Sequence, residues 1–327
     1  MGRVTARDPR FIASLREATR GEVRENEPLA GYSTFRIGGP ATVVFPAGPE
    51  DVAIALRHAD NAGVSWFALG LGSNVLLPDA GLEALVIRLG KGLDGVRSDG
   101  DRWWFGAGLP APLVARQTAA AGFAGLHKMV GVPGTVGGGV FMNAGCHGAE
   151  WADVVQRVTV VDPNGVDRVL DREEIPFRYR RSGLERVIVL ETEVALHQAE
   201  PALLEQEVRD LFEWRQRGTP FNQPCCGSTF TNPDLPPGGH PSGLRSAGQF
   251  LDAADLKGYT IGRVQVSPLH ANYFVNLGGG TADDVRRLIE HARDRVRDRF
   301  GVRLELEVKV VSPAGEIEPT DGVRTDG

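Results

Sequence analysis

The chain has 327 residues, of which 42% are hydrophobic and 24% charged, and its formal net charge is −6. Its apolar runs are shorter than the roughly 18 residues that a membrane helix needs, and the negative charge argues against a broad nucleic-acid-binding surface. Because one hydrophobic core rarely serves a chain of this length, we expect two or three domains.

The N-terminal part of the chain predicts helices alternating with short buried strands. Its first residues mix charged and apolar side chains without a continuous apolar stretch, which argues against a signal peptide and predicts a cytoplasmic protein. Apolar periodicity, initial prolines and terminal glycines predict helices at 10–30, 49–62 and 110–122, a buried strand from Trp66 into a glycine turn, and strands at 84–89 and 102–108.

The C-terminal half predicts a hairpin, long helices and a final strand. Pro163-Asn164-Gly165 is typical of a turn between two strands. Further patterns predict a strand at 187–196, helices at 201–217 and 281–300, a strand at 302–311 and a frayed tail at 312–327. The proline- and glycine-dense segment 220–243 is either a linker or a loop that carries a site.

Gly70-Leu71-Gly72-Ser73-Asn74 resembles a dinucleotide-binding turn because it follows a buried strand. It lacks the third glycine and the helix of that fingerprint, which excludes a Rossmann site. Two interpretations remain. The turn is a purely structural one, which the segment alone favours, or its backbone N–H groups form a nest for an anion.

The segment GVPGTVGGGVFMNAG at 131–145 contains so many glycines that its backbone conformation or a ligand must require them. It has no P-loop lysine, and without hydrophobic periodicity it predicts irregular backbone rather than a helix. A segment packed against a flat ligand and a crossover between domains are equally consistent with it.

Other polar segments are ambiguous by themselves. The arginines in FRYRRS (177–182) suit an anion site or a solvated loop, and GSTFTNP (227–233) lacks the elbow of a serine hydrolase. Glu305 and Glu307 lie on the polar face of the last strand, where glutamate is usually exposed. Three cysteines, two of them adjacent, predict reduced structural thiols, and we expect no metal site.

Taken in order, these segments resemble the UDP-N-acetylenolpyruvoylglucosamine reductase (UDP-N-acetylmuramate dehydrogenase) family of flavoenzymes. The resemblance extends from about residue 27 to 310. It is carried by YSTFRIGGPA (32–41), LGLGSNVLL (69–77), AGFAGL with GVPGTVGGGVFMNAG (121–145), FRYRRS, GSTFTNP, LKGYTIGRVQVSPLHANYFVN (256–276) and LELEV (304–308).

The resemblance implies an α+β protein with a two-domain FAD-binding fold of the vanillyl-alcohol-oxidase type and a third α+β domain for the substrate. The implied domains are 1–80 and 81–205 for FAD, the second joined by the C-terminal strand 302–311, and 206–301 for the substrate. That strand would then be a possible neighbour of 187–196.

The resemblance also implies cofactors, a substrate and site residues. FAD and NADPH are the cofactors, and a UDP-sugar enolpyruvyl ether is the small-molecule substrate of an enzyme of peptidoglycan synthesis; a monomer is favoured. Arg180, Ser228 and Glu307 are the catalytic residues, with Ser228 as proton donor, and Tyr179 and Asn232 bind the substrate. The implied FAD-binding residues are Gly70, Leu71, Gly72, Ser73, Asn74, Gly131, Pro133, Gly134, Thr135, Gly137, Gly138, Asn143 and Gly145.

Among the departures from the family pattern, two bear on the substrate site. The strand at 187–196 leaves no room for the tyrosine-bearing loop that one subtype carries, which indicates the subtype without the loop. Thr231 stands where lysine is common, which removes a cation near the expected diphosphate, and Arg215 or Arg217 could supply it.

Two other functions stay open. One is a flavin oxidoreductase of the same fold that oxidises an alcohol or sugar. The motifs GSTFTNP and HANYFVN favour the reductase instead. The other is a nucleotide-sugar-binding regulator without catalysis, against which the presence of Arg180, Ser228 and Glu307 speaks.

Overall fold

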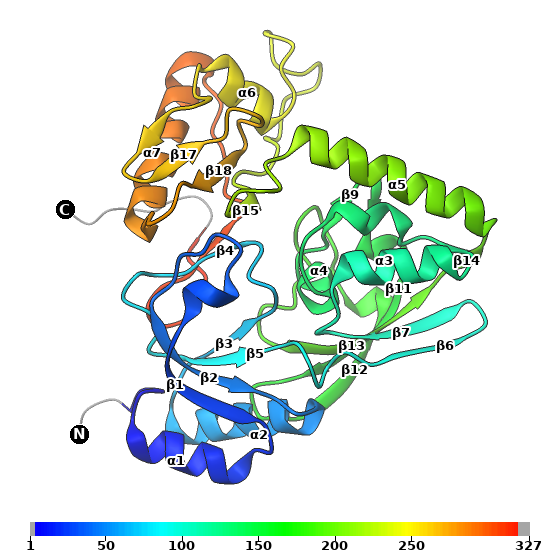
Figure 1. The fold of residues 1–327 in the computed structure, drawn as a ribbon, viewed down its shortest axis with the longest axis vertical. Helices are drawn as coiled ribbons and strands as arrows, with labels where there is room; N and C mark the ends of the chain where they lie inside the picture. The colour runs from blue at the N-terminus through cyan, green and yellow to red at the C-terminus, as the bar shows by residue number, and fades with distance from the viewer. Residues whose placement is uncertain (1–3, 320–327) are drawn as a thin grey trace. The chain divides into compact units, whose positions relative to one another are not determined.

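The computed structural model describes residues 4–319, which form two compact units (Figure 1). Unit 1 comprises 1–27, 41–71 and 82–215, and unit 2 comprises 28–40, 72–81 and 216–327. Within the described part of the chain, no helix combines the length and apolarity needed to cross a bilayer.

Unit 1 contains a four-stranded sheet in the order β1-β2-β5-β3, in which β2 and β3 run parallel to β5. Its strands are β1 Glu22–Pro28, β2 Pro40–Phe45, β3 Trp66–Leu69 and β5 Leu85–Arg88, and its helices are α1 Pro9–Ala18 and α2 Pro49–Ala62. Pro49 starts α2 and Gly63, with φ of +63°, ends it. The two helices and the apolar strands share one core.

A second sheet of unit 1 is antiparallel, in the order β12-β11-β13-β7-β6. Its strands are β6 Val96–Asp99, β7 Arg102–Gly106, β11 Val155–Val161, β12 Asp167–Asp171 and β13 Ile188–Ala195. The helices α3 Ala111–Ala120 and α4 Val136–Phe141 belong to the same unit, as do residues 201–215 of α5 Pro201–Gly218. The predicted hairpin between β11 and β12 is confirmed.

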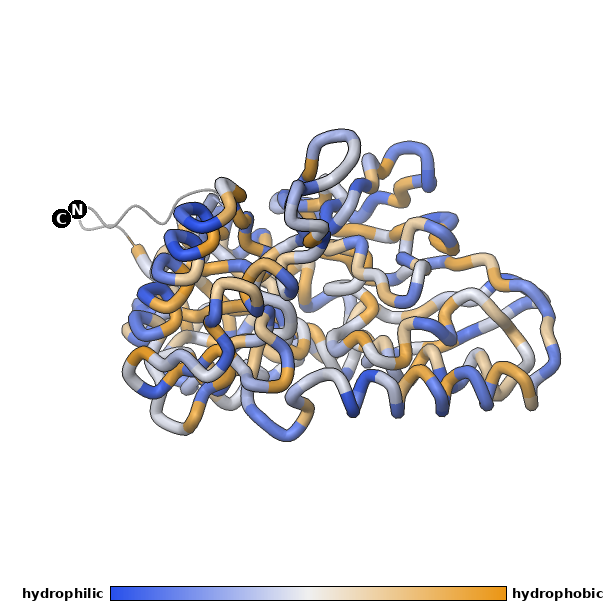
Figure 2. Tube along the Cα trace, turned by 90° about the horizontal axis from the view of Figure 1, so that it is seen from above, coloured by the Kyte–Doolittle hydropathy of each residue, from blue (hydrophilic) through white to orange (hydrophobic). Residues whose placement is uncertain are grey.

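Unit 2 is an antiparallel sheet in the order β15-β18-β17-β16 with two helices. Its elements are β15 Cys225–Ser228, α6 Ala247–Ala253, β16 Thr260–Ile261, β17 Val264–Val266, β18 Tyr273–Asn276 and α7 Ala282–Phe300. Thr281 and Asp284 form the capping box of α7. The helical parts of the tube in Figure 2 show both hydrophilic and hydrophobic colours, as expected for elements that bury one face.

The remaining elements are short. Within residues 4–319, the two-stranded pairs are β4 Val75–Leu76 with β19 Lys309–Val310, β8 Phe123–Ala124 with β14 His197–Gln198, and β9 Gly145–Cys146 with β10 Ala149–Glu150. The 3₁₀ turns of the same range are η1 Leu29–Tyr32, η2 His127–Gly131, η3 Trp151–Asp153 and η4 Arg172–Glu174.

Three predictions need correction. The helix expected at 10–30 ends at Ala18, and β1 follows it. The segment 302–311 keeps its alternation of buried and exposed residues, but only Lys309–Val310 forms a regular strand. This strand pairs with β4 and is no neighbour of 187–196, because β13 already pairs with β11 and β7 on its two edges.

The division into three domains stays a prediction. The first sheet of unit 1 includes β5 Leu85–Arg88, which lies beyond the expected boundary at residue 80. Residues 312–318 of the expected tail turn back along the preceding chain, since Ile317 pairs with Val311 and Glu318 binds Arg286 at 2.8 Å. Residues 320–327 of that tail lie outside the described residues.

Candidate active site

The glycine turn after β3 requires glycine at its centre. Gly72 has φ of +63°, and a side chain there would overlap the carbonyl oxygen of Tyr32. The carbonyl of Gly72 accepts a hydrogen bond from the Thr34 amide at 3.1 Å. The boundary between the two units runs through this turn, after Leu71.

The segment 131–145 contains a short helix, α4, although its lack of hydrophobic periodicity predicted irregular backbone. Thr135 accepts a hydrogen bond from the Gly138 amide at 3.2 Å and so caps the short helix α4. The glycines let this helix approach its neighbours: a Cβ at Gly137 would lie 2.8 Å from that of Ala107, and a Cβ at Gly139 would overlap the Trp151 ring. The sequence of α4 has no hydrophobic periodicity, because the helix packs closely through its glycines and not through large apolar side chains.

The two glycine-rich segments meet within unit 1. A Cβ at Gly70 would lie 2.6 Å from Thr135 Oγ1, so the end of β3 and the start of α4 are in contact. Thr135 is buried, whereas Gly138 in the first turn of α4 is exposed. Gly138 therefore exposes backbone without a side chain at the start of α4.

The loop 178–182 is hydrogen-bonded to the end of α4 and to the chain that follows it. Three hydrogen bonds make the connection: Ser182 Oγ to the Phe141 carbonyl at 2.7 Å, Asn143 Nδ2 to the Arg178 carbonyl at 3.1 Å, and Arg180 Nη2 to the Gly145 carbonyl at 3.0 Å. The guanidinium of Arg180 also lies 4.8 Å from the centre of the Tyr179 ring. Arg180 is thus held at the edge of the glycine-rich segment.

Unit 2 brings Ser228 and Glu307 onto neighbouring extended segments. The carbonyl of Thr229, the residue after Ser228, accepts a hydrogen bond from the Glu307 amide at 2.9 Å. Asn74 Nδ2 donates to the Glu307 carbonyl at 3.1 Å, which joins the glycine turn to the same place. Burial, Cys225 and the Glu307 charge raise the pKa of the Cys226 thiol, so this cysteine stays protonated.

The other predicted site residues lie at the following places. Tyr179 is half exposed in the loop 178–182, in unit 1 with Arg180. Asn232 lies in unit 2 with Ser228 and Glu307, and its side-chain oxygen accepts a hydrogen bond from the Ala247 amide at 3.1 Å. Asn143 is completely buried.

Asn272 was not among the predicted site residues, although it holds the chain next to Ser228. Its side chain accepts from the Phe230 amide at 3.0 Å and donates to the Phe230 carbonyl at 2.8 Å, while its own carbonyl accepts from the Thr229 amide. These bonds fix the chain directly after Ser228. The residue belongs to the segment HANYFVN, so its position in a motif was visible, but its partner 42 residues away in sequence was not.

Arg215, near the end of α5, packs against the glycine-rich segment. A side chain at Gly131 would overlap Arg215, whose Nη1 lies 3.4 Å from Cys146 Sγ. Burial, together with the charges of Arg215 and Lys128, lowers the pKa of His147. The positive charge of Arg215 therefore lies close to both Gly131 and Cys146.

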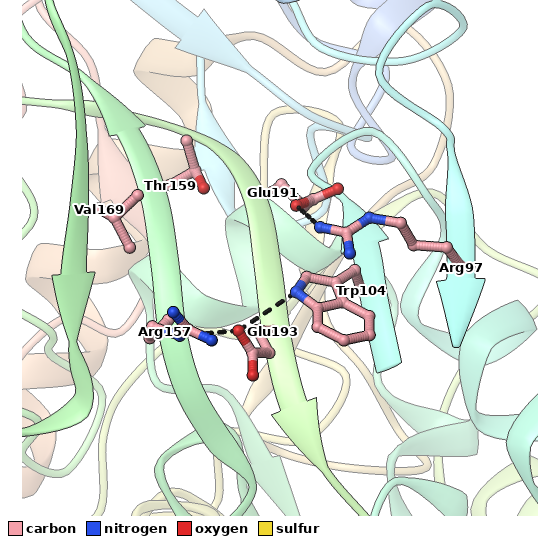
Figure 3. Close-up of a pocket in the computed structure, with 7 residues that line it drawn as sticks. All are labelled: Arg97, Trp104, Arg157, Thr159, Val169, Glu191 and Glu193. Atoms are coloured by element: carbon pink, nitrogen blue, oxygen red, sulfur yellow. Dashed lines mark hydrogen bonds and ion pairs between the residues drawn. The ribbon is translucent and has the colours of Figure 1, made fainter. Parts of the chain in front are cut away.

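A hollow of about 310 Å³ lies on the antiparallel sheet of unit 1 (Figure 3). Its charged side chains pair with one another: Arg157 binds the buried Glu193 at 2.8 Å, and Arg97 binds Glu191 at 2.7 Å. Trp104 Nε1 donates to Glu193 at 3.2 Å. We interpret this hollow as a cross-strand network that stabilises the sheet, distinct from the candidate site.

Comparison with known proteins decides the family. The C-terminal domain model of UDP-N-acetylenolpyruvoylglucosamine reductase matches residues 219–311, and an FAD-binding domain model matches 40–169. The reductase of that name from Rubrobacter xylanophilus is 44% identical over 290 residues, covering 88% of this chain and 94% of the relative. The chain belongs to the UDP-N-acetylenolpyruvoylglucosamine reductase family.

Further relatives agree. The reductase from Caulobacter vibrioides is 41% identical over 301 residues, covering 90% of this chain and 97% of the relative. The crystal structure of the reductase from Thermus caldophilus is similar with a TM-score of 0.74 and 32% identity, over 89% of this chain and 99% of that one.

Membership of the reductase family makes the chain a flavin-dependent oxidoreductase of peptidoglycan precursor synthesis, with FAD and NADPH as cofactors. The predicted fold class, an FAD-binding fold of the vanillyl-alcohol-oxidase type followed by the reductase C-terminal domain, is confirmed. The residues present fit FAD, because the two segments expected to contact it meet where the Thr135 side chain lies against Gly70, and Gly138 of the same segment is exposed.

Proposed function

We propose that this chain reduces UDP-N-acetylglucosamine enolpyruvate to UDP-N-acetylmuramate. Bound FAD would take a hydride from NADPH and supply it to the methylene carbon of the enolpyruvyl group. The observation that carries the proposal is the pairing of Glu307 with Thr229, which sets Glu307 beside Ser228, together with the Asn74 bond that links Glu307 to the glycine turn.

The side chains have complementary roles in this proposal. Addition of hydride to the methylene carbon leaves negative charge on the α-carbon and the carboxylate of the substrate. The Arg180 guanidinium stabilises that charge, and Glu307 assists. Ser228 Oγ donates a proton to the α-carbon, so the product gains one hydride and one proton in total.

The remaining assignments rest on position. We propose that backbone N–H groups of 70–74 bind the FAD diphosphate, and that the segment 131–145 lies along the flavin; its predicted contacts are Gly131, Pro133, Gly134, Thr135, Gly137, Gly138, Asn143 and Gly145. Tyr179 and Asn232 are assigned to the substrate. Support for Gly138 comes from its exposure on α4, whereas Gly137 is buried against Ala107.

We also propose the subtype without the inserted tyrosine loop. This is supported by the continuous course of the chain from β13, which ends at Ala195, through β14 to the start of α5 at Pro201. In the absence of lysine at 231, Arg215 is the better candidate for the diphosphate charge, because it lies against the glycine-rich segment.

Replacement of Ser228 by alanine separates the two half-reactions. Under anaerobic conditions, Ser228→Ala is expected to bleach with NADPH like the wild type, but the return of flavin absorbance on adding the enolpyruvyl substrate slows by roughly 10²–10⁴-fold, the usual contribution of general acid catalysis. Ser242→Ala, which removes an exposed hydroxyl of unit 2, is the control.

Two results would contradict the proposal. Equal slowing of both half-reactions in Ser228→Ala would remove the proton-donor role. Bleaching of the wild type by NADPH without recovery on adding the enolpyruvyl substrate would show that the protein uses a different oxidant.

A further inference from the structure

Asn143 bridges the loop of Arg180 and the chain beyond β10. Its Nδ2 donates to the Arg178 carbonyl at 3.1 Å, and its Oδ1 accepts from the Ala152 amide at 3.0 Å. The residue is 0% exposed. Only a carboxamide offers one donor and one acceptor in this arrangement, so both ends of the side chain are fixed.

The Arg178 carbonyl is the base of the turn that carries Arg180. The Arg178 amide donates to the Arg181 carbonyl at 2.9 Å, and the Arg181 amide donates to the Arg178 carbonyl at 3.0 Å. Within this turn Arg180 has φ of +56°, an unfavourable conformation for a residue with a long side chain. Such a conformation persists only where its surroundings hold it.

Asn143 itself adopts φ of +42°, which asparagine tolerates better than most residues. This conformation turns the chain after α4, so that residues 141, 143 and 145 each contact the loop. Among the bonds that connect the two segments, the one from Asn143 Nδ2 to the Arg178 carbonyl joins the left-handed residue Asn143 to the base of the turn that contains the left-handed residue Arg180.

We propose that Asn143 is a positioning residue for Arg180. It holds the base of the 178–181 turn and thereby fixes the direction of the guanidinium, so it acts in the same half-reaction as Arg180. This inference rests on the proposed role of Arg180. It differs from the prediction that Asn143 contacts the cofactor, because both polar ends of its side chain bind protein groups.

The test uses the FAD-loaded enzyme and Asn143→Asp. Aspartate keeps the shape, the tolerance of positive φ and the acceptor for Ala152, but it places an oxygen against the Arg178 carbonyl. We expect flavin reduction by NADPH within about twofold of wild type, and reoxidation by the enolpyruvyl substrate slower by roughly 10–100-fold, the scale of a displaced catalytic group. Asn26→Asp is the control, an exposed asparagine with φ of +50°.

A double-mutant cycle identifies the route of the effect. In an Arg180→Ala background, Asn143→Asp is expected to cause no further loss in reoxidation, because there is no guanidinium left to position. Asn143→Gly, which keeps the positive φ without the repulsion, should show the same split between half-reactions. Urea midpoints of all variants check that they are folded.

Four outcomes would overturn the inference. Losses that multiply in the double mutant would show that Asn143 acts independently of Arg180. A shifted flavin absorbance with both half-reactions slowed equally would make Asn143 a cofactor contact. Normal reoxidation in both Asn143 variants, with Arg180→Ala slow, would refute the positioning role and leave the proposed function intact. Normal reoxidation in Arg180→Ala would instead refute the proposed role of Arg180, and the positioning role with it.

Discussion

Glycine occurs in the segment 131–145 for two different physical reasons. Gly134 has φ of +136°, which other residues rarely adopt, so its backbone conformation requires glycine. Gly137 and Gly139 lie in the helix α4, where the conformation suits any residue, and they are required because Ala107 and Trp151 occupy the space of a side chain. Gly138, on the exposed side of α4, has neither constraint.

Alanine substitutions at two adjacent glycines distinguish packing from backbone entropy. Gly139→Ala is expected to lower the free energy of unfolding by about 1–3 kcal/mol, because its methyl group would overlap the buried Trp151 ring. Gly138→Ala is expected to change it by less, or to raise it by about 0.4–1 kcal/mol through the reduced entropy of the unfolded chain. Urea unfolding at saturating FAD measures both, and equal losses would disprove the packing explanation.

At the scale of elements, α5 is joined to η2 by a buried histidine. His127 Nε2 lies 3.0 Å from Glu207 Oε2, and His127 is only 6% exposed. Burial lowers the pKa of His127, although the Glu207 carboxylate opposes this shift. The folded protein therefore favours the neutral imidazole of His127 more strongly than the unfolded chain does.

The sign of the resulting pH dependence follows from linkage. Above about pH 6.5 His127 is neutral in both states, and below it the unfolded chain binds the proton more readily, so stability falls as the pH drops. When the pH is lowered from about 7.5 to 5.5, we expect the urea midpoint of unfolding to fall less in His127→Gln than in the wild type. His291→Gln, in unit 2, is the control; the same pH dependence in His127→Gln and wild type would contradict the assignment.

At the scale of the whole molecule, unit 2 is assembled from three separate parts of the chain. Phe35, Ile37 and Leu76, from the two short N-terminal parts, are buried in the same core as α6 and α7. Asn276 Nδ2 donates to the Phe35 carbonyl at 3.0 Å. Residues 216–327 alone would lack these side chains and would expose part of this core to solvent.

A fragment comprising residues 216–327 is therefore expected not to fold cooperatively. It lacks the apolar side chains of Phe35, Ile37 and Leu76 and the strand β4 that pairs with β19. Circular dichroism during urea titration should show a broad, non-cooperative loss of structure, whereas the full chain should show cooperative transitions. A sharp cooperative transition in the fragment would show that these contacts are dispensable.

The sequence predicted local structure well where the signals are local. Pro49 and Gly63 bound α2, the Asn164-Gly165 turn joins β11 to β12, and Thr281 caps α7, because capping and turn formation depend on residues close in sequence. It failed at α4, whose glycines conceal a helix, and at the partner of the last strand, since strand pairing depends on distant segments.

By itself the sequence determined the family, the fold class and the cofactors, because these follow from ordered motifs that cover most of the chain. Only the tertiary structure decided that the glycines at 137 and 139 serve packing, that Asn272 fixes the chain after Ser228, and that Asn143 holds the base of the Arg180 turn. Each of these depends on atoms from segments far apart in sequence, and a hydrogen bond or a steric overlap exists only once folding has brought both partners within a few ångströms of each other.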